Sequence, residues 1–211
     1  EAARVANVAI VNGEVAELGS RVGGFGSFNY NWEAGVVWFV KKGRIFTGRE
    51  IKEGDYLVGL REEGFRSNGL SLVRKIMQRY YGDNWHETPW KKENLTLGDL
   101  ALTPSKIYTS AVVDMFGGYC NEPKTEIHGA VNITGGGIPE KLGRVLKPSG
   151  LGAVIDEPFK PSEFILYTQA LGSVSDREAY KTWNMGQGMI IITPKPEDVI
   201  RISREHGITA Q

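Results

Sequence analysis

The 211-residue sequence lacks several features that mark whole classes of protein. It has a single cysteine, Cys120, so no disulfide can form within the chain, and we interpret that thiol as buried and inert in a reducing compartment. No apolar run approaches the roughly 20 residues that span a bilayer. The N-terminus carries no basic region followed by a long apolar one, as a signal peptide would. We therefore expect a cytoplasmic protein that does not bind a membrane.

Net charge is also absent, because 25 lysines and arginines balance 25 aspartates and glutamates. No global field would attract nucleic acid or an anionic membrane. The three histidines, His86, His128 and His206, are too far apart in sequence for the usual spacing of metal ligands. We interpret His128, the one near a glycine loop, as a structural histidine whose ring nitrogens have partners in the fold.

Glycine is in surplus, with 27 residues where about 15 are expected at the usual ~7%. The glycines show no period and lie in short loops between patterned segments. Such loops are typical of proteins that bind phosphate or nucleotides through backbone N–H groups.

Hydrophobic patterning predicts strands and helices in alternation. The expected strands cover residues 8–14, 34–46 (with a hairpin turn), 54–60, 126–132, 152–156 and 188–194. The expected helices cover residues 67–82, 103–116, 139–146, 161–171, 176–183 and 196–207, and 84–99 is interpreted as a polar surface loop. This order predicts an α/β (α+β) fold with a mixed β-sheet covered by helices. A boundary near residue 47 divides the chain into 1–47 and 48–211.

Three segments combine glycines with polar residues at the junction of a strand and a helix. "REEGFRSNGLSLVRK" and "NITGGGIPEKL" each precede a helix, and "WNMGQGMIII" precedes a strand. A helix N-terminus favours an anion through its free N–H groups and its dipole. Arg66, Ser67, Asn68 and Thr134 add side-chain donors. The alternative is that each loop is an ordinary turn with a capping residue, and neither of the first two is a Walker A loop.

Two glutamates follow the first apolar run. Glu14 and Glu17 in "NGEVAELG" stand where a strand would end, a position suited to holding Mg²⁺ or moving a proton. The alternative is a pair of solvated side chains in a loop.

The order of several motifs resembles one enzyme family. "GFRSNGLSLVRKI", "TPSKIYT", "IHGAVNITGGGIPEKLGRVL", "AVIDE" and "AYKTWNMGQGMIII" are similar to segments of the aminoimidazole ribonucleotide (AIR) synthetases, also called phosphoribosylformylglycinamidine cyclo-ligases. The resemblance runs from residue 3 to about residue 206.

That resemblance implies a two-domain α/β enzyme, usually a homodimer, that uses ATP and Mg²⁺ in de novo purine synthesis. Residues 1–47 would be the end of the N-terminal domain, which binds ATP and forms the dimer, and 48–211 most of the C-terminal domain, which binds the ribonucleotide substrate. The family's glycine-rich ATP segment would lie upstream of residue 1 and a last strand beyond Gln211. We therefore expect a fragment that is inactive by itself.

The resemblance also implies roles for single residues. Arg66, Ser67, Asn68 and Gly69, with Thr134, Gly135, Gly136 and Gly137, would contact the substrate's phosphate and ribose. Glu14 would be the catalytic acid or a magnesium ligand, and Asn184 and Gly186 would shape the cleft.

The chain departs from the family pattern at two of these loops. The family usually has histidine where this chain has Arg66 and Asn132, and arginine cannot act as a base near neutral pH. Two alternatives therefore remain open. One is another ATP-using relative, such as a selenophosphate synthetase, thiamine-phosphate kinase or hydrogenase maturation factor. The other is a non-catalytic module that binds a phosphorylated ligand.

Overall fold

A computed structural model describes residues 1–24, 29–91 and 94–211. Its helices and strands follow one another in the order α1 Ala2–Val5, β1 Tyr56–Arg61, α2 Leu70–Tyr81, α3 Leu97–Ala101, α4 Thr109–Phe116, β2 Gly129–Asn132, α5 Gly137–Leu146, α6 Glu163–Leu171, α7 Asp176–Thr182, β3 Gln187–Thr193 and α8 Pro196–Glu205. The α/β (α+β) class is confirmed.

The three strands form one sheet in the order β1-β3-β2. Both pairings are antiparallel, so the sheet is antiparallel rather than a mixture of parallel and antiparallel pairs. The central strand β3 is buried on both faces, which explains its uninterrupted run of isoleucines. The outer edge of β1 pairs with the last residues of the chain, where Gly59 and Gln211 exchange two backbone hydrogen bonds.

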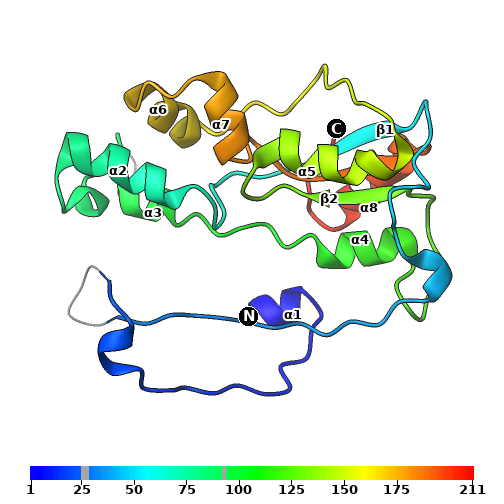
Figure 1. Cartoon of the computed structure of the whole chain (residues 1–211), viewed down its shortest axis with the longest axis horizontal. Coiled ribbons are helices and arrows are strands. Elements are labelled where there is room, and N and C mark those ends of the chain that lie inside the picture. Colours follow the sequence, from blue (N-terminus) through cyan, green and yellow to red (C-terminus); the bar gives the residue numbers. More distant parts are fainter. Residues whose placement is uncertain (25–28, 92–93) are drawn as a thin grey trace.

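Helices cover both faces of this sheet (Figure 1). Ile190 and Ile192 pack with α5 on one face, whereas Ile191 packs with α4 and α8 on the other. This alternation is the two-residue period of a strand. A second core joins α2, α3, α6 and α7 at one end of the sheet, around Phe65, Phe164 and Trp183.

Three expected strands are absent from the described residues. Residues 8–14 and 34–46 pair with no described strand, residues 42–44 form a 3-10 turn, and most of these residues lie exposed beside the layered body (Figure 1). Residues 152–156 also form no ladder, and Val154 is 86% exposed. A strand requires a neighbour for its N–H and C=O groups. Next to β1 that position is taken by residues 209–211.

Two further expectations were wrong in their boundaries. The helix expected from residue 103 begins at Thr109, because the Thr103 hydroxyl donates to Leu100 O at the end of α3 and Lys106 N donates to Glu62. The loop expected at 84–99 contains a 3-10 turn at Trp85–Glu87 and the first residues of α3, which a Thr96–Asp99 capping box begins; residues 92–93 lie outside the described part. Cys120 is free but exposed rather than buried.

Candidate functional site

The first glycine loop joins the end of β1 to the start of α2. Gly69 is the N-cap of α2 and has a φ of +71°, a conformation that L side chains rarely adopt. A Cβ there would lie 2.5 Å from Cδ1 of Trp183, so only glycine fits. The Trp183 indole N–H in turn points to Gly69 O at 3.4 Å. The core of the helical cluster thus holds the start of α2 in place.

The second glycine loop joins β2 to α5. Gly136 and Gly137 have φ values of +95° and +61°, and Gly137 N donates to Thr134 O at 2.8 Å. A Cβ on Gly137 would lie 1.7 Å from the carbonyl oxygen of Tyr180 in α7. The glycines are therefore required by a close approach of two backbones.

The two loops approach each other closely. A Cβ, which Gly135 lacks, would lie 3.4 Å from Oδ1 of Asn68. No side chain caps the N-terminus of either α2 or α5 by a hydrogen bond. Ser67 and Asn68 therefore lie beside the start of α2, and Thr134 and Gly135 beside the start of α5, with Asn68 and Gly135 close to each other.

Arg66 lies between the loops and contacts both sides. Its Nη1 atom donates to Asn132 Oδ1 at 2.8 Å, to Ile133 O at 3.2 Å and to Gly188 O at 2.8 Å. Arg66 itself has a φ of 60°, an uncommon value for a residue other than glycine. The guanidinium therefore joins the first loop to the end of β2 and the start of β3.

A buried acid lies beside this guanidinium. The Glu62 side chain is 0% exposed, and its Oε2 atom is 3.6 Å from Nε of Arg66. The same carboxylate accepts from Lys106 N at 3.2 Å and from the Tyr108 hydroxyl at 3.1 Å. Burial, together with the Glu62 charge, raises the pKa of Tyr108 far above its ordinary value, so the hydroxyl stays protonated and donates.

A pocket of about 550 Å³ opens over this network. Arg66, Lys106 and Asn132 line its polar side, and Val112, Phe116 and Met189 are among the residues of its apolar side. Trp38, from the segment before residue 47, also lines it. The pocket thus offers two cationic side chains next to an apolar wall.

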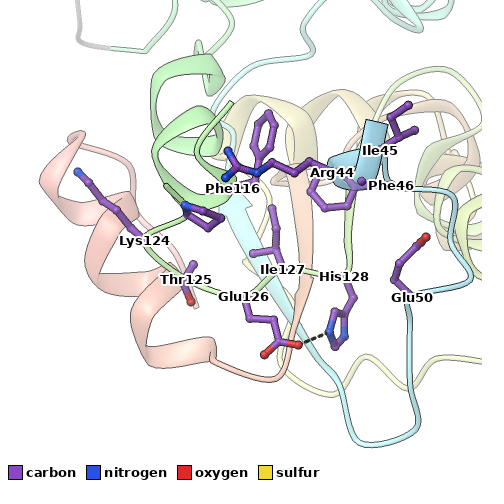
Figure 2. Close-up of a pocket in the computed structure, with 12 residues that line it drawn as sticks. Arg44, Ile45, Phe46, Glu50, Phe116, Lys124, Thr125, Glu126, Ile127 and His128 are labelled. Carbon is purple, nitrogen blue, oxygen red and sulfur yellow. Dashed lines mark hydrogen bonds and ion pairs between the residues drawn. The ribbon is translucent and has the colours of Figure 1, made fainter. Parts of the chain in front are cut away.

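A second pocket, of about 560 Å³, lies elsewhere, between residues 43–50 and 116–128 (Figure 2). His128 lines it and is held by Asp55 Oδ2 at 2.7 Å and Glu126 Oε1 at 2.8 Å. Burial lowers the pKa of His128, but the two carboxylates outweigh that effect and raise it overall. The interpretation of His128 as a structural histidine is confirmed. Neither glycine loop lines this pocket, so it is not our candidate site.

The remaining expected site residues lie in two places. Asn184 is buried, donates to Gly64 O at 2.7 Å and accepts from Gly186 N at 2.9 Å, so it shapes the turns beside the first loop. Glu14 is exposed, and no described interaction joins it to the glycine loops. Among the described residues, no group of three His, Cys, Asp or Glu side chains could hold a metal.

Sequence reasoning missed the inner part of the site. Glu62, Tyr108 and Lys106 come from two segments that meet only in the fold. Glu140 was also missed: a Cβ on Gly136 would lie 1.8 Å from its Oε2 atom, so this carboxylate folds back over the first turn of α5. The acidic pair after β1 in "REEGFR" was the one available signal, because a charged residue directly after an apolar strand needs a partner if it is buried.

Comparison with known proteins gives consistent relatives. The chain is 33% identical over 214 residues to the phosphoribosylformylglycinamidine cyclo-ligase of Bacillus cereus (strain G9842). The matched region covers 100% of this chain and 59% of that relative. It is 35% identical over 195 residues to the protein of the same name from Methanococcoides burtonii, over 92% of this chain and 54% of the relative. The chain therefore spans a little more than half the length of the curated relatives it matches.

None of the helices within the described ranges has the length and apolar character that crossing a membrane requires. Residues 52–211 match the family model described as "AIR synthase related protein, C-terminal domain". This match takes in both glycine loops and every strand of the sheet. The chain belongs to the AIR synthase related family and contains its C-terminal domain.

Proposed function

We propose that the protein to which this chain belongs converts formylglycinamidine ribonucleotide to aminoimidazole ribonucleotide in de novo purine synthesis. In this reaction ATP would phosphorylate the formyl-amide oxygen, an amidine nitrogen would attack that carbon, and phosphate would leave as the ring closes. The proposal rests on the cyclo-ligase names of the relatives and on one structural observation, the close approach of Asn68 in the first glycine loop to Gly135 in the second.

Within this proposal, residues 48–211 bind the ribonucleotide. Ser67, Asn68 and Thr134, with the loop amides around Gly69 and Gly135–Gly137, would hold its phosphate. The N-termini of α2 and α5 add favourable dipoles, and neither has a side-chain cap that a phosphate would have to displace. Asn184 and Gly186 would keep the first loop in shape through the Gly64 carbonyl.

ATP, Mg²⁺ and the homodimer belong to the whole protein in this proposal, with residues 1–47 as the end of the N-terminal domain and the cytoplasm as the location. A single exposed carboxylate, Glu14, does not make a magnesium site, and the described residues offer no group that does. Glu14 remains our candidate for acid or metal chemistry, and we derive no step through the metal.

One observation favours a second function, that of a non-catalytic module which binds a phosphorylated ligand. The positions where the family usually has two histidines hold Arg66 and Asn132, and these two side chains are bonded to each other. Neither can exchange a proton with a substrate near neutral pH. A module of this kind would bind the ribonucleotide without converting it.

Calorimetric titration of the 211-residue chain with formylglycinamidine ribonucleotide tests the proposed site. The control ligand is the dephosphorylated riboside. We expect the ribonucleotide to bind and the riboside to bind at least ten times more weakly, and Thr134→Val to weaken ribonucleotide binding. Equal affinity for both ligands, or no binding of either, would refute a phosphate site. A turnover assay on the whole protein then separates the ligase from the module.

A further inference from the structure

The contacts of Arg66 place it between the parts of the site rather than at their surface. Three acceptors share its Nη1 atom, and they come from the end of β2, the residue after it and the start of β3. The side chain is 14% exposed. A phosphate ion bound by arginine usually takes two parallel N–H groups. Here the three protein acceptors already occupy Nη1.

Glu62 faces the guanidinium at its Nε atom, whereas the loop and sheet acceptors lie at Nη1. This carboxylate is fully buried and has only Arg66 as a cationic partner among the described ion pairs. A buried carboxylate without a partner is strongly unfavourable, so Arg66 cannot leave it to follow a ligand. The charge of Arg66 is also offset by Glu62, which weakens any attraction that the guanidinium would exert on a phosphate.

The result is a fixed distance between the two loops. Arg66 belongs to the first loop and stands two residues before Asn68, whereas Asn132 and Ile133 lead into the second loop, three and two residues before Gly135. Asn68 and Gly135 approach each other closely in the same two loops. An arginine in the left-handed region is uncommon and is retained only where surrounding contacts hold it there.

We propose that Glu62, Arg66 and Asn132 form a positioning network that sets the spacing of the two glycine loops. Arg66 acts on the ligand through Asn68 and Gly135 and does not touch the phosphate. The identity of that ligand rests on the proposed function, whereas the positioning itself does not. Arg66 and Asn132, the two members that bridge the loops, carry no group that exchanges a proton near neutral pH.

Amide hydrogen exchange on the unliganded chain tests the positioning without any ligand. We expect Arg66→Met and Asn132→Ala each to increase exchange at least tenfold for the amides of residues 64–69 and 133–137. The matched control is Lys106→Ala, which removes a cation from the same pocket; among the described hydrogen bonds and ion pairs, none joins its side chain to either loop. Unchanged exchange in Asn132→Ala, or an equal increase in the control, would overturn the proposal. Asn132→Ala keeps the test decisive if Arg66→Met does not fold.

Titration with formylglycinamidine ribonucleotide then separates positioning from direct contact. If Arg66 acts through Asn132, the losses of affinity in the two single variants will not multiply, and the double variant will bind about as weakly as Arg66→Met. Losses that multiply, with loop exchange unchanged, would make Arg66 a direct ligand and refute the network. If the wild-type chain does not bind at all, the proposed function fails, and the exchange experiment still decides the positioning.

Amide exchange of the loops, measured over a range of pH, separates positioning by Arg66 from a general contribution of this residue to folding. Arg66→His places a titrating group against Glu62, Tyr108 and Asn132, with Lys106 on the pocket side. We expect loop exchange in Arg66→His to rise as the pH passes through the histidine pKa, while the wild-type loops show no such transition beyond the intrinsic pH dependence of exchange. A transition in the wild-type loops, or none in Arg66→His, would contradict the proposal.

Discussion

Nη1 of Arg66 lies 2.8 Å from Oδ1 of Asn132, at two positions where the resemblance to the AIR synthetases implies histidine. The two departures from that pattern are therefore linked, since Asn132 accepts a hydrogen bond from Arg66. Ile133 O and Gly188 O are the other two acceptors of the same Nη1 atom, so Arg66 would keep partners at the sheet without Asn132.

The buried ion pair gives the first stability prediction. Arg66→Met leaves Glu62 buried without its cation, so we expect a loss of about 3 kcal/mol in the free energy of unfolding. Glu62→Gln in the same chain removes that unpaired charge, so the double variant should recover roughly 1–2 kcal/mol of the loss. Urea unfolding of all four proteins measures this coupling. Strictly additive losses would show that the two side chains do not interact.

Two glycines of α5 give a matched pair of predictions. Gly137→Ala places a Cβ 1.7 Å from the Tyr180 carbonyl in a backbone with a φ of +61°, so we expect a loss of roughly 3 kcal/mol or more. Gly143→Ala lies in the same helix, where its Cβ would meet nothing within 4 Å beyond the adjoining residues and backbone of the helix itself, and should stabilise the chain by roughly 0.5–1 kcal/mol. Thermal and urea unfolding distinguish these opposite signs. A stable Gly137→Ala would mean that α5 and α7 do not approach as described.

Glu140 gives a prediction about affinity. Its carboxylate folds back over the first turn of α5 and opposes an anion that would bind there. We expect Glu140→Gln to tighten ribonucleotide binding about two- to fivefold, which corresponds to roughly 0.4–1 kcal/mol at a helix end. Glu197→Gln makes the same charge change in the first turn of α8, away from the loops, and should leave affinity unchanged. Weaker binding in Glu140→Gln would place that carboxylate on the ligand side as a partner.

The hydrophobic period of the sequence predicted those strands and helices that bury one face of their own side chains in the core. The strands around residues 54–60 and 188–194 and the helices around 67–82 and 196–207 form as expected, because their own side chains make the core. The strands expected at 34–46 and 152–156 fail, because a ladder depends on a neighbour that the local sequence does not specify.

The residues of the candidate site also fall into two groups, those with a signal in the local sequence and those without one. The two glycine loops were visible in the sequence, since glycine at a strand–helix junction has a local cause. Glu62 and Tyr108 were not, because their hydrogen bond joins residues 46 positions apart. Arg66 was predicted as a residue of the site, but its bonds to Asn132 and Gly188 depend on how the sheet brings distant segments together.

His128 gives a prediction about pH. Burial opposes its charge, but the carboxylates of Asp55 and Glu126 outweigh burial and raise the pKa of the folded state above the ordinary value of 6.5. A group whose pKa is raised on folding stabilises the protein fully below its unfolded pKa, and this contribution disappears as the pH rises through the folded pKa. His128→Gln should therefore destabilise the chain most near pH 6 and progressively less toward pH 9.

Urea unfolding of the wild type and of His128→Gln at several pH values measures that difference. His86→Gln is the control, because His86 is exposed and its nearest carboxylate, on Glu87, is 3.8 Å away. Its effect should stay small and vary little over the same range. If the difference in free energy of unfolding between wild type and His128→Gln grew with pH instead, the prediction would be wrong. The neutral ring, and not the charged one, would then be the form bound by the two carboxylates. The turns before β1 and β2, which carry Asp55 and Glu126, would then be joined by a neutral hydrogen bond instead of an ion pair.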